Sequence, residues 1–124
     1  MHIEELNIII PNDDRKKELI AKEIEEIYAD ISFYYDRRKP ISNKFYNTYR
    51  ERIEDVLYSV GELSIPIFRI NDDLRDYNIK KYKHDPDMAR DMWLARYDSL
   101  HKPYSLLKNK CYLLFRKLDK LTKE

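Results

Sequence analysis

The sequence has little of what a β-sheet protein or a disulfide-stapled domain needs. Its 124 residues include one Gly, five Pro and one Cys. The strands of a β-sheet are joined by many tight turns, and these turns use Gly where φ is positive. A composition with so little Gly therefore favours long helices. One Cys cannot form an intramolecular disulfide, and Cys111 falls on an apolar helical stripe, where a Cys acts as a small buried hydrophobe. We therefore expect an all-α fold.

Long hydrophobic runs and targeting segments are also missing from the sequence. No stretch approaches the ~18 consecutive apolar residues of a membrane span, and the N-terminus lacks a basic segment followed by an apolar one. We expect no membrane association and a cytoplasmic location, or the host cytoplasm if the source is a virus. The chain has no Gln but fourteen Ile and fourteen Lys, a bias that favours a thermophilic or an AT-rich source, cellular or viral.

Apolar residues at helical spacing are abundant instead. In the C-terminal third they follow each other at steps of four and three residues, a spacing that keeps one helical face apolar. The members of this stripe are Trp93, Tyr97, Leu100, Tyr104, Leu107, Cys111, Leu114, Leu118 and Leu121. Similar stripes predict a helix over about 13–38 and a second from Ser42 or Asn43 to Pro66. A short helix should then run to about Lys80.

The last helix or helix pair should fill 86–122, because Asp85 is a good cap and Pro86 suits the first helical position. Pro103 interrupts this segment, but the apolar phase is the same on both sides of it, so we predict a kink or a very tight break there. Chain length allows one core, hence one domain over 1–124. The predicted fold is a bundle of three long helices and one short helix, with residues 1–11 as an N-terminal arm. Residues 1–10 of this arm should form a short strand or lay Leu6 and Ile9 on the bundle.

The last helix carries apolar residues on a second side. Met92, Leu106 and Leu113 lie seven or fourteen residues apart, opposite the main stripe, where a surface helix should be polar. A helix that is apolar on two sides is usually buried on two sides. We interpret this second face as a subunit or partner interface, with a homodimer as the expected assembly; the alternative is that the N-terminal arm covers it.

Charge is unevenly distributed although the net charge is only +1. Residues 1–31 hold nine acidic and four basic residues, and residues 101–124 hold two acidic and seven basic ones. Around the turn at 37–52, aromatic residues alternate with basic ones, a mixture suited to phosphates and unpaired bases. The nucleic-acid-binding candidates are Arg37, Arg38, Lys39, Lys44, Arg50 and Arg52, together with the basic C-terminal helix.

Catalytic and metal-binding motifs are sparse. No repeated Glu-x-x-His pairs and no Gly-rich phosphate loop are present, so we expect no metal site and no cofactor. One pattern, Arg96-x4-His101, resembles the motif of HEPN-type ribonucleases, which are small helical bundles that dimerise over RNA. This resemblance covers six residues, 96–101, and implies that Arg96 and His101 form a catalytic pair. Tyr97 departs from the family, which usually has a small polar residue after the Arg.

The function that these patterns favour is that of a small non-enzymatic binding or regulatory protein. It should act through protein–protein interaction, as a homodimer. Nucleic-acid binding through the 37–52 turn is the first alternative, and a HEPN-like ribonuclease using Arg96 and His101 is the second.

Overall fold

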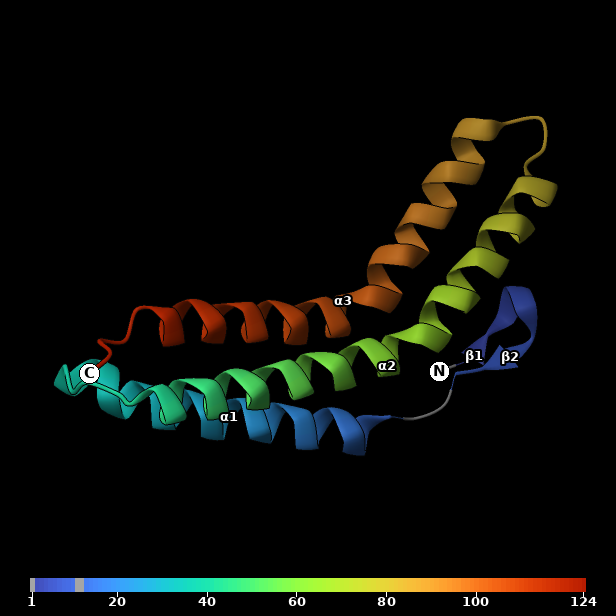
Figure 1. The fold of residues 1–124 in the computed structure, drawn as a ribbon. Helices are drawn as coiled ribbons and strands as arrows, with labels where there is room; N and C mark the ends of the chain where they lie inside the picture. The colour runs from blue at the N-terminus through green and yellow to red at the C-terminus, as the bar shows by residue number, and fades with distance from the viewer. Residues whose placement is uncertain (1, 11–12) are drawn as a thin grey trace.

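A computed structural model describes residues 2–10 and 13–124, and it confirms the all-α class. Three helices, α1 (Asp14–Arg37), α2 (Asn43–Lys81) and α3 (Pro86–Asp119), hold 24, 39 and 34 residues. They form a bundle (Figure 1). The N-terminal segment forms a small antiparallel hairpin, with β1 (His2–Ile3) and β2 (Ile8–Ile9) joined through a single 3-10 turn at Glu4–Leu6.

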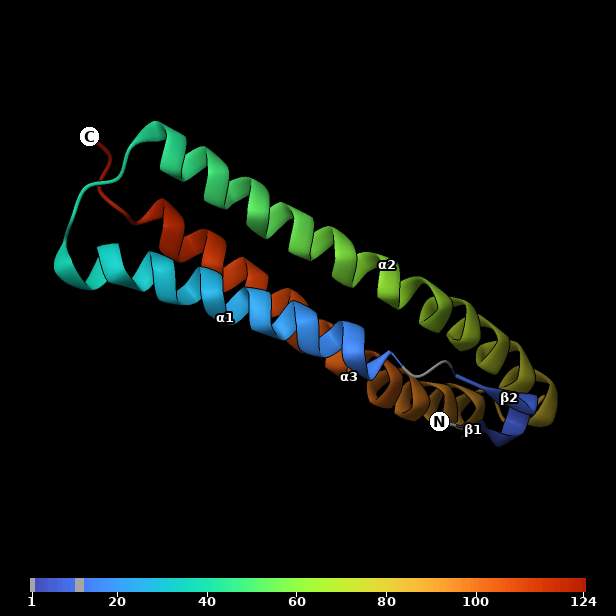
Figure 2. The ribbon, with the colours of Figure 1, turned by 90° about the horizontal axis from the view of Figure 1, so that it is seen from below.

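The longest element of the bundle is the antiparallel hairpin of α2 and α3. Its helices begin where their caps predict: Ser42 Oγ accepts from the backbone N–H of Phe45 at 3.0 Å, and Asp85 Oδ1 accepts from that of Met88 at 3.1 Å. α1 lies beside the N-terminal half of α2 and the C-terminal half of α3 (Figures 1 and 2). The bundle therefore has three helices along one half and two along the other.

The prediction that the second helix ends at Pro66 is wrong, and so is the separate short helix after it. α2 continues through Pro66 to Lys81. Proline removes one backbone hydrogen bond, but a stripe of buried residues stays in phase past it and keeps α2 packed on α3. This stripe steps by four and three through Val60, Ser64, Ile67, Asn71, Leu74 and Asn78. Because Ser64, Asn71 and Asn78 in this stripe are polar, the spacing of apolar residues alone did not predict that the helix continues.

Pro103 lies inside α3, which is one helix from Pro86 to Asp119, as the unbroken apolar phase predicts. Figure 1 shows that α3 bends near its middle and that α2 bends alongside it. A proline inside a helix is a common cause of such a bend. Because Pro66 and Pro103 both lie in these middle parts, the two helices change direction together and stay in contact.

The core is built from the predicted stripes. On α1 the buried residues are Ile20, Ile24, Ile27 and Ile31, and on α3 the main stripe is buried from Leu100 onward. Trp93 is only half-buried and donates its indole N–H to the Asn71 carbonyl at 3.1 Å. The C-terminal tail closes the end of the bundle, because Ile41 donates to Thr122 O at 2.8 Å and accepts from Glu124 N at 3.0 Å.

The N-terminal arm contains a strand, β2, which is one of the two predicted alternatives, but the packing predicted for Ile9 is wrong. Leu6 is partly buried against the core as expected, but Ile9 is 76% exposed. Hairpin pairing explains the error: Ile3 pairs with Ile8 and His2 with Ile9, and alternate strand residues point to opposite faces. Ile3 and Ile10 are the buried residues instead. Met1 and Pro11 of the predicted arm lie outside the described residues.

In the part of the chain that the structure describes, no helix is both long enough and apolar enough to cross a membrane.

Truncating a core side chain at the helix interface should destabilise the fold. Ile27 is fully buried on α1 and Leu114 is buried on α3. Ile27→Ala and Leu114→Ala should each lower the free energy of unfolding by about 2–5 kcal/mol, because each leaves a cavity in a packed core. Urea denaturation followed by circular dichroism measures the loss. The exposed Lys22→Ala on α1 is the control; equal small effects at all three positions would show that the stripes do not meet.

Candidate functional site

The second apolar face of α3 is exposed. Leu106 is 53% exposed, Leu113 is 59% exposed and Met92 is 44% exposed. The N-terminal arm leaves these side chains open and lies elsewhere, with Glu5 bound to Arg96 on α3. The alternative in which the N-terminal arm covers this face is therefore wrong for the described residues 2–10, which contact α2 and bind Arg96 of α3 instead. The side chains of the three interface candidates, Met92, Leu106 and Leu113, are therefore exposed to solvent in the isolated chain.

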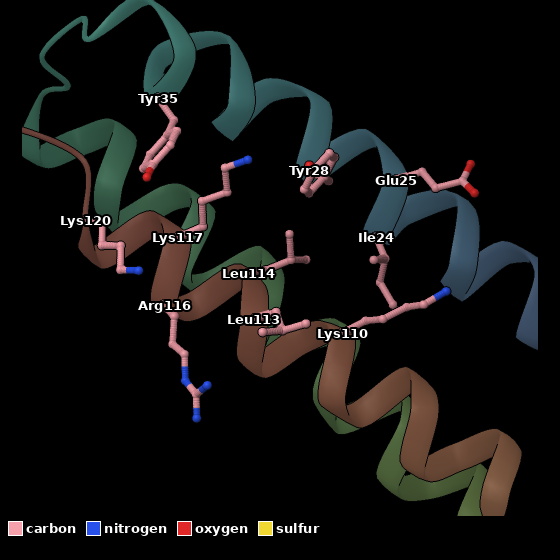
Figure 3. A pocket seen from close by; sticks show the side chains of 10 residues that line it. All are labelled: Ile24, Glu25, Tyr28, Tyr35, Lys110, Leu113, Leu114, Arg116, Lys117 and Lys120. Atoms are coloured by element: carbon pink, nitrogen blue, oxygen red, sulfur yellow. The ribbon is translucent and has the colours of Figure 1, made fainter.

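Leu113 also lines a groove between α1 and α3 (Figure 3). The groove has a volume of about 640 Å³. Its apolar floor consists of Ile24, Tyr28, Leu113 and Leu114. Its edges consist of Glu25, Tyr35, Lys110, Arg116, Lys117 and Lys120. Apolar walls with a few polar groups at the edge are typical of a binding site.

Lys117 reaches across the mouth of the groove from α3 to α1. Its Nζ donates to Ser32 Oγ at 2.9 Å and lies 4.3 Å from the ring centroid of Tyr28 and 5.0 Å from that of Tyr35. These contacts are cation–π interactions that hold the ammonium group over the two rings. Figure 3 shows the Lys117 side chain extending between Tyr28 and Tyr35. Lys117 therefore tethers α3 to α1 while the groove remains open beside it.

The edge of the groove is basic and unpaired. Within residues 2–10 and 13–124, none of the ion pairs involves Lys110, Arg116, Lys117 or Lys120. Glu25 is the single carboxylate among the lining residues. Nearby positive charges without counter-ions create a positive potential that attracts an anionic partner.

The six nucleic-acid candidates fall into two groups. Arg52 pairs with Glu23 at 2.7 Å and Arg50 pairs with Glu54 at 3.2 Å, so both guanidinium groups serve internal contacts. Arg37, Arg38, Lys39 and Lys44 make no ion pair among the described residues.

The aromatic residues of the same segment are largely used within the bundle. Phe45 stacks on Tyr49 with ring centroids 4.3 Å apart and contacts Tyr34 at 4.7 Å. Phe33 is exposed, but Arg37 lies over its ring at 4.0 Å and Lys39 at 5.2 Å. Few rings at this turn are therefore free to stack on bases.

Arg96 and His101 do not converge. They lie on one continuous helix, where five residues turn the side chains about 140° apart. Arg96 donates to Glu5 Oε1 at 2.6 Å, so its charge is already neutralised. His101 is 6% exposed, with its ring 4.2 Å from that of Tyr97 and 4.5 Å from that of Phe68. Burial lowers the pKa of His101, which keeps the ring neutral.

Metal and thiol chemistry find no support in the described part of the chain. No group of three or more His, Cys, Asp or Glu side chains in it is arranged to hold a metal ion. Cys111 is fully buried, and burial raises the pKa of its thiol to about 11, so it stays protonated at neutral pH. A buried thiol of this kind is a packing residue.

Sequence reasoning missed the groove and the hydrogen bonds between helices, among them that of Tyr49. Tyr28 and Tyr35 widen the apolar stripe of α1, and that widening was the available signal for the groove. Tyr49 donates its hydroxyl to Asp30, and burial together with this bond raises the pKa of Tyr49 to about 12. No periodicity could have paired Tyr49 with Asp30, because they lie on different helices.

No protein-family model, curated protein or solved structure matches this chain.

The lowered pKa of His101 predicts a loss of stability in mild acid. The folded protein binds a proton at His101 less tightly than the unfolded chain does. The free energy of unfolding is therefore highest above pH ~6.5, where His101 is neutral in both states, and it decreases as the pH falls below that value. His101→Phe keeps a ring at this position and cannot be protonated. Urea denaturation at pH 7.5 and at pH 5 should show a larger loss for the wild type than for the variant. The same loss in both would show that burial of His101 does not govern the response.

Proposed function

We propose that this chain is a non-enzymatic protein-binding module. Its binding surface is the groove between α1 and α3 together with the exposed leucines of α3 beside it. The observation that carries the proposal is an apolar-floored groove whose leucine, Leu113, is 59% exposed and lies on the same face as the 53% exposed Leu106. Burying such a side chain is worth ~1.5–3 kcal/mol, and a partner that covers the face gains this energy.

A helix is the element that fits such a surface. Partner helices commonly place one apolar face into a groove formed by two others, with anchors at i, i+3 or i+4 and i+7. The groove here lies between two helices, so a third helix laid in it would complete a bundle on this side. A second copy of the chain remains a predicted occupant.

Light scattering tests whether a second copy occupies this surface. If the chain is a homodimer through this face, Leu106→Glu with Leu113→Glu should give a monomer, because buried carboxylates without partners are costly. Circular dichroism should show unchanged helicity, since both positions are exposed. Leu19→Glu is the matched control: Leu19 is also 59% exposed but lies on α1 outside this groove. A dimer that survives the double substitution would show that the face is not the subunit interface.

Nucleic-acid binding is the second candidate function. It is supported by the four basic residues at the turn between α1 and α2 that lack ion pairs, Arg37, Arg38, Lys39 and Lys44. Phosphate contacts make binding weaken steeply with salt. Fluorescence anisotropy with single-stranded and duplex RNA and DNA should show a salt-dependent shift that falls in Arg37→Ala with Lys39→Ala. Binding that does not depend on salt or on these residues would contradict this candidate.

The HEPN-like ribonuclease has less support. The proposed pair would need Arg96 free of Glu5 and His101 open to substrate, whereas Arg96 is paired and His101 is buried. RNA cleavage by the wild type that is lost in His101→Ala, while the variant stays folded, would favour this function over binding alone.

A further inference from the structure

We infer that the groove between α1 and α3 takes an amphipathic helix of another protein, with apolar anchors flanked by Asp or Glu. This inference rests on the proposed protein-binding function and specifies the chemistry of the partner. It is carried by the combination of an apolar floor with a basic edge.

The size of the groove suits a short helical segment. Its lining residues on α3 and its C-cap run from Lys110 to Lys120, ten helical steps that cover about 15 Å at 1.5 Å per residue. Anchors at i, i+3 or i+4 and i+7 span about 10.5 Å by the same rise. The exposed Leu113 lies within this length, on the floor with Ile24 and Leu114. Two turns of a partner helix therefore fit along the floor.

The positive charge at the edge of the groove favours a partner helix with acidic residues beside its apolar face. Lys110, Arg116 and Lys120 line the edge without ion pairs among the described residues; the first two are on α3 and Lys120 directly follows its last residue. Carboxylates on both sides of the partner's apolar face would lie near these groups. Complementary charge speeds association and excludes partners of the wrong sign. A helix flanked by Lys would meet like charges instead.

A second copy is a poorer occupant for the same reason. Between Asp98 and Asp119, α3 contains no acidic residue and five basic ones. A two-fold pairing through Leu106 and Leu113 brings the same patch of both copies together. The basic residues flanking the leucines, among them Lys110 and Arg116, would then repel their counterparts. A foreign acidic helix avoids this repulsion.

A nucleic acid is also a poorer occupant of the groove. Ile24, Leu113 and Leu114 offer aliphatic surface, which neither hydrogen-bonds to bases nor forms a stacking platform for them. Recognition of single strands relies on aromatic platforms beside a basic track. Two aromatic rings, those of Tyr28 and Tyr35, line the groove. Both already contact the Lys117 ammonium group, which leaves them less available to stack on bases.

The experiment uses a displayed library of 20-residue helical peptides. Each peptide carries Leu, Ile, Met or Phe at i, i+3, i+4 and i+7, and either Glu, Gln or Lys at the flanking positions. The library is selected against the full chain, against Leu113→Glu and against Lys110→Glu with Lys120→Glu. Matched baits are Leu19→Glu, which has the same exposure as Leu113, and Lys22→Glu with Lys80→Glu, which makes the same change in net charge outside the groove.

We expect the wild type to select peptides with Glu at the flanks. Their affinity should fall by about tenfold or more for Leu113→Glu and for the Lys110/Lys120 reversal, and should be unchanged for the matched baits. The reversed bait should select Lys flanks. Circular dichroism checks that each bait is folded. Leu113→Glu tests the apolar floor and the Lys110/Lys120 reversal tests the basic edge, so a folding defect in one bait leaves the other test valid.

Three results would overturn this inference and leave the proposed function standing. The first is selection of neutral or Lys-flanked peptides that still depend on Leu113. The second is a wild-type dimer that Leu113→Glu dissociates, because a second copy would then occupy the groove. The third is a wild type that selects Glu-flanked peptides whose affinity is unchanged by the Lys110/Lys120 reversal.

Two results would overturn the proposed function itself. The first is a selection that yields no peptide dependent on Leu113, from a wild type that is monomeric at high micromolar concentration. The second is single-stranded RNA that binds the wild type but not the Lys110/Lys120 reversal and that displaces the selected peptides, which would make the groove a nucleic-acid site.

Discussion

The structure depends on the continuous packing of α2 against α3 past a proline in each helix. At 1.5 Å per residue α2 is ~58 Å long, whereas α1 is only ~36 Å long. The shorter α1 therefore cannot cover the whole α2–α3 hairpin. The core therefore divides into a half with three helices and a half with two, as Figure 1 shows.

The N-terminal hairpin covers part of the half that α1 leaves open. Ile3 is fully buried there, and Glu5 forms the ion pair with Arg96. This ion pair occupies the guanidinium group of Arg96, the arginine of the Arg96-x4-His101 pattern. It joins residues 91 positions apart, so it also ties the start of the chain to α3. Along the half with three helices, the open surface is instead the groove beside Leu113.

The sequence predicted the parts of the fold that local chemistry determines. Ser42 and Asp85 mark the starts of α2 and α3 because their side chains satisfy free backbone N–H groups. The course of α2 beyond Pro66 was not predictable from apolar spacing, because Asn71 and Asn78 occupy core positions there. Asn78 donates to the Leu74 carbonyl at 2.9 Å, so a polar residue is satisfied within its own helix and can be buried. Such pairing is invisible to a pattern of hydrophobicity.

The sequence carried only an indirect signal for the groove, the widening of the α1 stripe by Tyr28 and Tyr35. A stripe shows which residues of a helix face inward, but it does not show how closely two helices approach. In the structure Tyr28 and Tyr35 are both exposed, with Lys117 held against their rings. The Lys117 side chain spans from α3 to α1 here, with its ammonium group bonded to Ser32 and held against the two rings. A groove is present here because a charged side chain, which must keep its head near water, takes a position between two apolar faces.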